Sequence, residues 1–184
     1  MTEDYKIIEE KHYWTSDHKL KFCGYGEWVE EADFTKIEYR GYEARLVRVF
    51  KIEPYAKEEA YFGGYLCGYV KIPEIHPYFR QKEIDLECHG GITYNESHEE
   101  HWVGFDCMHS GDFVPTSEHM KRTIPELIEI KKAFSTPEGM EEHPWFKPIY
   151  RNINYCIHEC ITIIDQLIES ALVKDKVGKT DGMD

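Results

Sequence analysis

Residues 150–172 read "YRNINYCIHECITIIDQLIESAL", and their apolar residues follow the spacing of an amphipathic helix. Apolar side chains recur at intervals of three and four, which places them on one face of a helix. The members of this stripe are Ile153, Cys156, Ile157, Cys160, Ile163, Ile164, Leu167, Ile168 and Leu172. We therefore predict a helix over about 152–172 whose apolar face packs against a sheet.

The strands of this sheet are predicted from two blocks that precede the helix. Residues 34–73 are rich in β-branched and aromatic residues and are broken at glycines, which indicates three strands with tight turns. The polar loop "ESHEE" joins the last two strands of the second block, as in a hairpin. The strands predicted in this second block cover residues 84–89, 91–95 and 101–107.

The predicted fold class is α+β, with a single domain over residues 1–173 in which an antiparallel sheet packs against a long C-terminal helix. A length of 184 residues suits one hydrophobic core. A shorter helix is predicted over 125–134, and residues 174–184 are predicted to form a polar C-terminal tail.

The composition narrows the classes of partner. A formal net charge of −13 repels a nucleic-acid backbone, so we expect no direct nucleic-acid binding. The sequence has no apolar run of the roughly 18 residues that cross a bilayer, and its N-terminus lacks the features of a signal peptide. We therefore expect no membrane contact and a cytoplasmic location, where the six cysteines stay free thiols. The composition leaves the oligomeric state open.

Residues 89–112, "HGGITYNESHEEHWVGFDCMHSGD", contain four histidines and four glycines but no lysine or arginine. A solvated acidic surface would not need the histidines and glycines. If residues 84–89 and 101–107 are adjacent strands, alternation places His89 and Asp106 on one face of the sheet. The stretch therefore contains a candidate functional site.

The spacing after the last strand adds two residues to this candidate site. Asp106, His109 and Asp112 follow at intervals of three, which can bring three side chains to one point in a turn. We take His89, Asp106, His109 and Asp112 as candidate catalytic residues and as candidate metal ligands. These groups suit a divalent metal ion, which is the first candidate cofactor. The spacing matches no zinc motif, and the alternative is that Asp106 and His109 only brace a turn.

Four further residues are candidates for binding a ligand. Tyr94 and Trp102 are expected to form walls of the site, and Tyr69 to stack with Trp102 on a nucleotide-like ligand. His76 precedes a proline in an extended loop, and it either approaches the site or is an exposed loop histidine. An anionic ligand would require an arginine from outside the stretch, and those considered are Arg40, Arg45, Arg48 and Arg80.

Four strings carry a resemblance to a known group of proteins: "GYVKIPEIHP", "ECHGGITY", "WVGFDCMHSGD" and the helix start "YRNINY". Over residues 64–166 the chain resembles small proteins encoded by bacteriophages and prophages, chiefly through its "HGG-x-T" and "GFD-x-x-H-x-GD" strings. The resemblance implies an accessory role inside an infected bacterium. It brings no activity with it.

Three functions follow from these observations, and whether the protein is an enzyme stays open among them. The first is a phage-type accessory or counter-defence protein that acts in the host cytoplasm by binding a host protein or a small nucleotide-like ligand through the His/Asp site. The second is a hydrolase in which His89, Asp106, His109 and Asp112 hold a divalent ion that activates water. The third is an acidic nucleic-acid mimic that inhibits a host nuclease.

Overall fold

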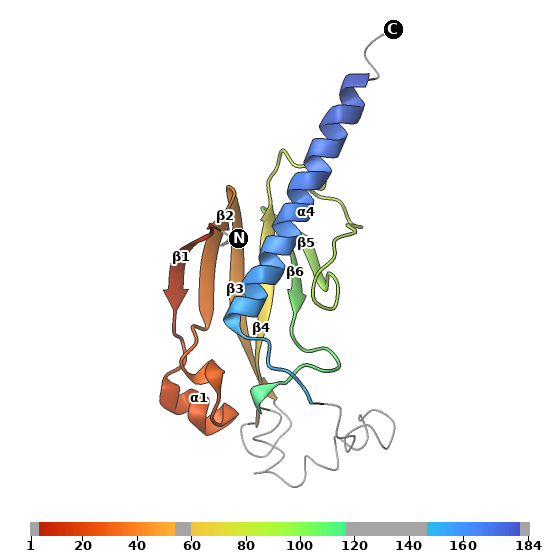
Figure 1. Ribbon diagram of the computed structural model, residues 1–184. Helices are drawn as coiled ribbons and strands as arrows, with labels where there is room; N and C mark the ends of the chain where they lie inside the picture. The colour runs from red at the N-terminus through yellow and green to blue at the C-terminus, as the bar shows by residue number, and fades with distance from the viewer. Residues whose placement is uncertain (1–3, 54–59, 117–146, 181–184) are drawn as a thin grey trace.

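One long helix lies across one face of a six-stranded antiparallel sheet (Figure 1). The computed structural model describes residues 4–53, 60–116 and 147–180. The helices are α1 (Ser16–Cys23), the short 3-10 turn η1 (Glu27–Val29) and the long helix α4 (Ile153–Thr180). The strands are β1 (Lys6–Lys11), β2 (Phe34–Tyr39), β3 (Tyr42–Glu53), β4 (Ala60–Ile72), β5 (Tyr94–Ser97) and β6 (His101–Asp106).

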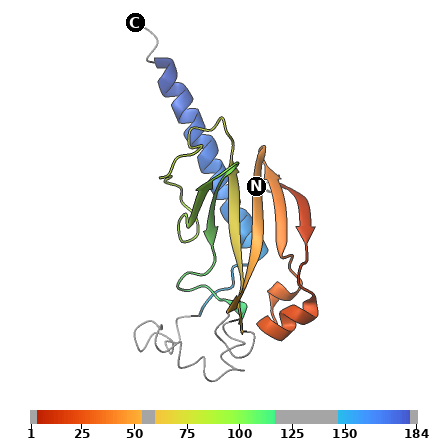
Figure 2. The same cartoon turned by 180° about the vertical axis from the view of Figure 1, so that it is seen from behind.

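The spatial order of the strands is β1-β2-β3-β4-β6-β5, and every neighbouring pair is antiparallel. We call the face that α4 covers the inner face and the opposite one the outer face. Figure 2 shows the outer face, on which no helix of the described residues lies. The predicted α+β fold, a single antiparallel sheet packed against a C-terminal helix, is confirmed.

The hydrophobic core lies between α4 and the inner face of the sheet. Gly68 on β4 lets the helix come close, because a Cβ there would lie 2.9 Å from the Cys160 sulfur and 2.4 Å from the Phe105 ring. Leu172, the last residue of the predicted stripe, is 57% exposed, since this part of α4 extends past the sheet (Figure 1). The buried side chains that α4 contributes are Cys156, Ile157, Cys160, Ile161, Ile163, Ile164 and Leu167.

A buried arginine fixes the end of the sheet from which α4 begins. The Arg48 side chain is fully buried on β3, and its guanidinium donates to Asp33 at 3.1 Å and to Glu31 at 2.7 Å. It also donates to the Gly64 carbonyl at 2.9 Å and to the Tyr150 hydroxyl at 2.7 Å. Because a buried charge is stable only when it is paired and hydrogen-bonded, these partners hold their segments together.

The first turn of α4 is hydrogen-bonded to Glu31, one of the partners of Arg48. Glu31 accepts the Ile153 N–H at 3.0 Å with its second carboxylate oxygen. The Asn152 side chain accepts the Tyr155 N–H at 3.0 Å, as an N-cap does. The helix therefore begins at a position set by Arg48 and Glu31.

The segment 84–89 is not a strand, so that prediction is wrong. It runs in extended form beside α4, and its backbone bonds to side chains of the helix. The Glu87 N–H donates to Gln166 at 2.8 Å, the Gln166 amide donates back to the Glu87 carbonyl at 2.7 Å, and the His89 N–H donates to Glu159 at 2.7 Å. The alternation of polar and apolar residues reflects an extended chain that buries Leu86, without a strand partner.

The other predicted elements agree with the structure apart from their bounds. The three strands expected over 34–73 are β2, β3 and β4, and the strand expected over 101–107 is β6. The strand expected over 91–95 begins only at Tyr94, and α4 continues to Thr180, beyond the predicted start of a tail at 174. The helix predicted over 125–134 lies outside the described residues.

The sequence also predicted that the six cysteines are free thiols and that no segment crosses a membrane. All six cysteines are free thiols, including Cys107 and Cys156, whose sulfurs lie 3.5 Å apart in the core. Among the described helices, none combines the length and the apolar composition that crossing a bilayer requires.

Replacing Ile164 by alanine should reduce the free energy of unfolding by about 2–5 kcal/mol, because its side chain is fully buried between α4 and the sheet. Urea denaturation followed by circular dichroism measures this change. Glu169→Ala on the exposed side of the same helix is the control and should change stability little. Equal midpoints for the two variants would contradict a core position for Ile164.

Candidate functional site

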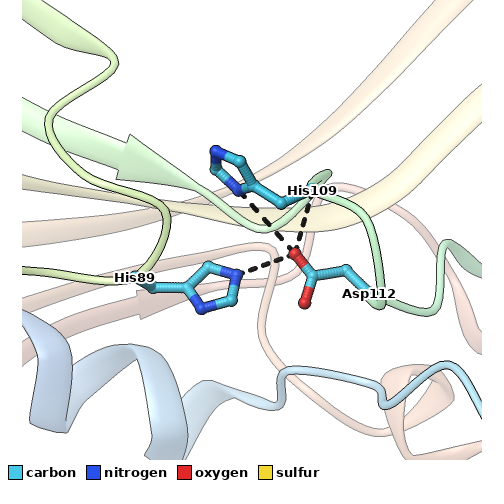
Figure 3. Close-up of side chains that lie close together, drawn as sticks. All are labelled: His89, His109 and Asp112. Atoms are coloured by element: carbon cyan, nitrogen blue, oxygen red, sulfur yellow. Dashed lines mark hydrogen bonds and ion pairs between the residues drawn. The ribbon is translucent and has the colours of Figure 1, made fainter.

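His89, His109 and Asp112 converge beside the N-terminal end of α4 (Figure 3). One ligand atom from each residue lies within 4.8 Å of the other two. His89 Nε2 is 2.7 Å from Asp112 Oδ2, and His109 Nδ1 is 3.8 Å from the same oxygen. The two imidazole rings lie 5.3 Å apart and nearly perpendicular. We call these three side chains the His/Asp centre.

Two different parts of the chain supply the centre. His89 ends the extended segment beside α4, whose Glu159 holds its backbone N–H. His109 and Asp112 lie in the turn after β6, which the Asp112 N–H closes by donating to the His109 carbonyl at 3.0 Å. Asp112 also pairs with Ile149, so the chain that leads into α4 passes directly beside this turn.

Residues at the start of α4 hold two members of the centre from behind. The Tyr155 hydroxyl is 3.0 Å from His89 Nδ1, on the side of the ring away from Asp112. Arg151 Nε donates to Asp112 Oδ1 at 3.0 Å and leaves Oδ2 to the histidines. Such outer partners orient the ligands in protein metal sites, where each histidine bonds through its second nitrogen.

Gly90 makes room for the ring of His109, the third residue of the centre. The His109 ring packs on Gly90, where a Cβ would lie only 2.2 Å from its Cε1 atom. Gly90 has φ +67°, and the following Gly91 has φ +84° with no atom within 4 Å of its Cβ position. The His109 ring therefore depends on the missing side chain at Gly90, whereas both glycines share the left-handed backbone.

The electrostatics of the centre favour an ionised Asp112. Burial alone would raise the pKa of this carboxyl, but hydrogen bonds from His89, Arg151 and the His109 N–H outweigh burial and lower it. Burial, with the nearby Glu159 carboxylate, raises the pKa of Tyr155 to about 12, so its hydroxyl stays protonated. The hydrogen bond to Asp112 raises the pKa of Arg151. At neutral pH the ionised carboxylate of Asp112 and the His89 ring therefore lie beside the charged guanidinium of Arg151 and the protonated hydroxyl of Tyr155.

His109 carries a polar atom without a hydrogen bond. Its Nδ1 is buried and has no hydrogen-bond partner among the residues that the structure describes, and the carboxylates of Asp106 and Asp112 lie 3.7 and 3.8 Å away. Buried polar groups are nearly always satisfied, so an atom of this kind requires an explanation such as an ion or a ligand.

Among the described residues of the centre, Asp106 is paired with His109. Its carboxylate accepts the Met108 N–H at 3.1 Å and lies outside the set whose ligand atoms are mutually close. The prediction that it shares a face with His89 on adjacent strands is wrong, because residues 84–89 form no strand. His89, His109 and Asp112 converge for another reason: the segment before His89 is bonded to α4, and the turn that carries His109 and Asp112 is bonded to Ile149 and Arg151, which lead into that helix.

The predicted ligand-binding aromatics lie elsewhere. Tyr69, Tyr94 and Trp102 line a hollow of about 290 Å³ on the outer face, so the expectation that Tyr94 and Trp102 form walls of the His/Asp site is wrong. The Arg45 guanidinium stacks 4.1 Å above the Trp102 ring, and Tyr69 contacts Tyr94 edge to face at 5.1 Å. The hollow is completed by Phe34 and Val47. We call it the aromatic hollow.

His76 belongs to neither site. Its ring is buried, with Nε2 2.8 Å from the Leu167 carbonyl, while Nδ1 accepts the Tyr78 N–H at 3.0 Å. It connects the loop after β4 to α4 and is neither an exposed loop residue nor part of the His/Asp centre.

Sequence reasoning missed Arg151 and Tyr155. Arg151 lies just before the N-cap residue Asn152 and Tyr155 lies in the first turn of α4, and the Arg151 guanidinium is 4.7 Å from the centre of the Tyr155 ring. Their spacing of four could have paired them with each other. It carried no signal that they would lie beside His89 and Asp112.

Comparison of the chain with protein-family models, with curated protein sequences and with solved structures finds no match. The function is therefore argued from the geometry of the site.

Stability should depend on the ionisation of Asp112. Because its folded pKa is lowered, its contribution is present above the unfolded value of about 3.9 and is lost as the pH falls through the folded value. We expect the stability of the wild type to fall relative to that of Asp112→Asn as the pH drops below about 4. Urea denaturation of both proteins across this range tests the expectation, and a pH-independent difference between them would refute it.

Proposed function

We propose that the His/Asp centre binds a divalent metal ion, zinc first, and that the protein is a metal-dependent hydrolase. The observation that carries the proposal is the convergence of two imidazoles and one carboxylate within 4.8 Å, with His89 and Asp112 each held by an outer partner. Three protein ligands of these types are the composition of catalytic zinc sites and leave a coordination position open for water. An ion at this position also explains the unsatisfied Nδ1 of His109.

The chemistry of such a site is hydrolysis. A divalent ion lowers the pKa of water and polarises the oxygen of an ester or amide. Asp106, whose carboxylate lies 3.7 Å from His109 and is partly exposed, is a further base beside the centre and would accept the proton of the attacking water. The oxygen of that water forms the new bond to the substrate, the bond to the leaving group breaks, and the proton passes to the leaving group.

The biological setting is a separate part of the proposal. The resemblance to bacteriophage and prophage proteins supports an accessory role in the cytoplasm of an infected bacterium. The hydrolase would act there on a host or phage metabolite.

Zinc binding is tested with protein purified without a metal-affinity column, by elemental analysis and by calorimetric titration with Zn²⁺. We expect one zinc per chain. Gly90→Ala should weaken zinc binding by about tenfold or more, because the new methyl group displaces the His109 ring.

Gly91→Ala is the matched control. It imposes the same backbone strain on the same turn but meets no atom within 4 Å, so zinc affinity should stay near that of the wild type. A wild-type protein that binds no zinc refutes the metal centre. Equal losses in the two variants would remove His109 from the set of ligands.

A second candidate function, binding of a nucleotide-like ligand, is favoured by the aromatic hollow. No helix of the described residues covers the outer face, and outward positions of such a face are normally polar. At the middle of this sheet they are occupied by Phe34, Val47, Tyr69 and Trp102. A planar ring could stack there on the aromatic side chains.

Adenosine monophosphate is a suitable probe for this second function. Trp102→Ala should weaken its binding by about 1–3 kcal/mol, the usual contribution of one stacked base. Trp14→Ala, at a tryptophan outside the hollow, serves as the control. The absence of measurable binding to the wild type would refute the nucleotide-binding role.

A further inference from the structure

We propose that Arg151 is the phosphate receptor of the His/Asp centre and that the substrate is a phosphate monoester. The inference rests on the proposed metal-dependent hydrolase and names its substrate class. It starts from the fact that Arg151 places a positive charge directly against the ionised Asp112, in a chain of net charge −13.

The terminal guanidinium nitrogens of Arg151 are available as hydrogen-bond donors. Its Nε donates to Asp112 Oδ1 at 3.0 Å, and within the described residues no acceptor is bonded to either of its terminal nitrogens. The side chain is 24% exposed, so part of it faces solvent. If its role were only to orient Asp112, the terminal pair of nitrogens would have no function at the centre.

The guanidinium is also fixed in position. It lies 4.7 Å from the centre of the Tyr155 ring and is held at Nε by a carboxylate that is 2% exposed. Tyr155 in turn contacts His89 through its hydroxyl. Because the side chain is already ordered, a bound anion needs little further loss of conformational freedom.

The number of acceptors needed points to phosphate. The two terminal nitrogens of a guanidinium form a fork that takes two oxygens of one anion. A metal ion at the centre takes an oxygen as well. A carboxylate has only two oxygens. A phosphate monoester has three non-bridging oxygens, so it can bind both terminal nitrogens of the guanidinium and the metal ion at once.

Charge supports the same ligand. The Arg151 guanidinium and a divalent ion at the centre would place two cationic groups side by side, because Arg151 is bonded to the ligand Asp112. The oxygens of a phosphate monoester dianion can contact both groups, while a neutral ester or peptide gains less from either.

The reaction that follows is hydrolysis of the ester to inorganic phosphate and an alcohol. The oxygen of water forms a bond to phosphorus, the bond between phosphorus and the ester oxygen breaks, and the alcohol leaves with the proton. Arg151 holds two non-bridging oxygens while charge develops on them, which stabilises the transition state.

The product, inorganic phosphate, is the probe for this proposal. Its affinity is measured by calorimetry on zinc-saturated wild type, Arg151→Gln and Arg151→Lys, with zinc content checked in each sample. We expect Arg151→Gln to weaken phosphate binding by tenfold to a hundredfold and Arg151→Lys, which keeps the charge but not the fork, to bind with intermediate affinity. Arg40→Gln, at an exposed arginine paired with Asp165, should bind like the wild type.

The possible results separate the two proposals. Phosphate affinity that is equal in wild type and Arg151→Gln at saturating zinc overturns the receptor role and leaves Arg151 as a support for Asp112. Acetate that binds the wild type as tightly as phosphate overturns the substrate class. If the wild type binds no zinc, the metal centre fails first, and a phosphate affinity of the zinc-free protein that depends on Arg151 would still support the receptor.

Discussion

The buried charge of Arg48 is the constraint on which the arrangement of this protein depends. A guanidinium inside a protein must be paired, and here the carboxylates of Asp33 and Glu31 pair with it from the chain before β2. The Tyr150 hydroxyl also accepts from it and donates to Glu31 at 2.6 Å, which ties the approach to α4 into the same cluster. Removing one partner would leave a donor of the buried guanidinium without its acceptor, so these segments keep their positions relative to β3 together.

The position of α4, once set by this cluster, determines the site. Glu159 of the helix accepts the backbone N–H of His89, Tyr155 in its first turn contacts the His89 ring, and Arg151, just before the helix, donates to Asp112. The two histidines therefore meet through the helix, and the register of the sheet does not decide their separation. A single-sheet protein gains in this way a rigid polar site at one end of its covering helix, which is the kind of support that a preorganised site requires.

Periodicity predicted the parts of the fold that repeat, and it failed where backbone groups bond to side chains. The stripe from Ile153 to Leu167 and the strand beginning at His101 follow spacings of 3.6 and 2, so the main packing could be derived from sequence. Polar and apolar residues alternate around Leu86. An extended chain shows this pattern both when its backbone bonds to another strand and when it bonds to side chains such as Gln166 and Glu159. The contact of Arg151 with Asp112 joins residues 39 positions apart, and no local spacing encodes it.

The hydrogen bonds of His89 imply how the centre would respond to a metal ion. An ionised carboxylate can only accept, so at 2.7 Å from Asp112 the Nε2 atom of His89 carries the proton, while Nδ1 lies 3.0 Å from the Tyr155 hydroxyl, which can donate to Nδ1 when the ring is neutral. A metal ion needs the lone pair of Nε2, and the proton must then leave that atom. Tyr155 can accept as well as donate, so the neutral ring can hold its proton on Nδ1 without losing this partner. Uptake of a metal ion would thus be linked to a shift of the His89 proton from Nε2 to Nδ1. The Tyr155 hydroxyl can form a hydrogen bond with Nδ1 in both states.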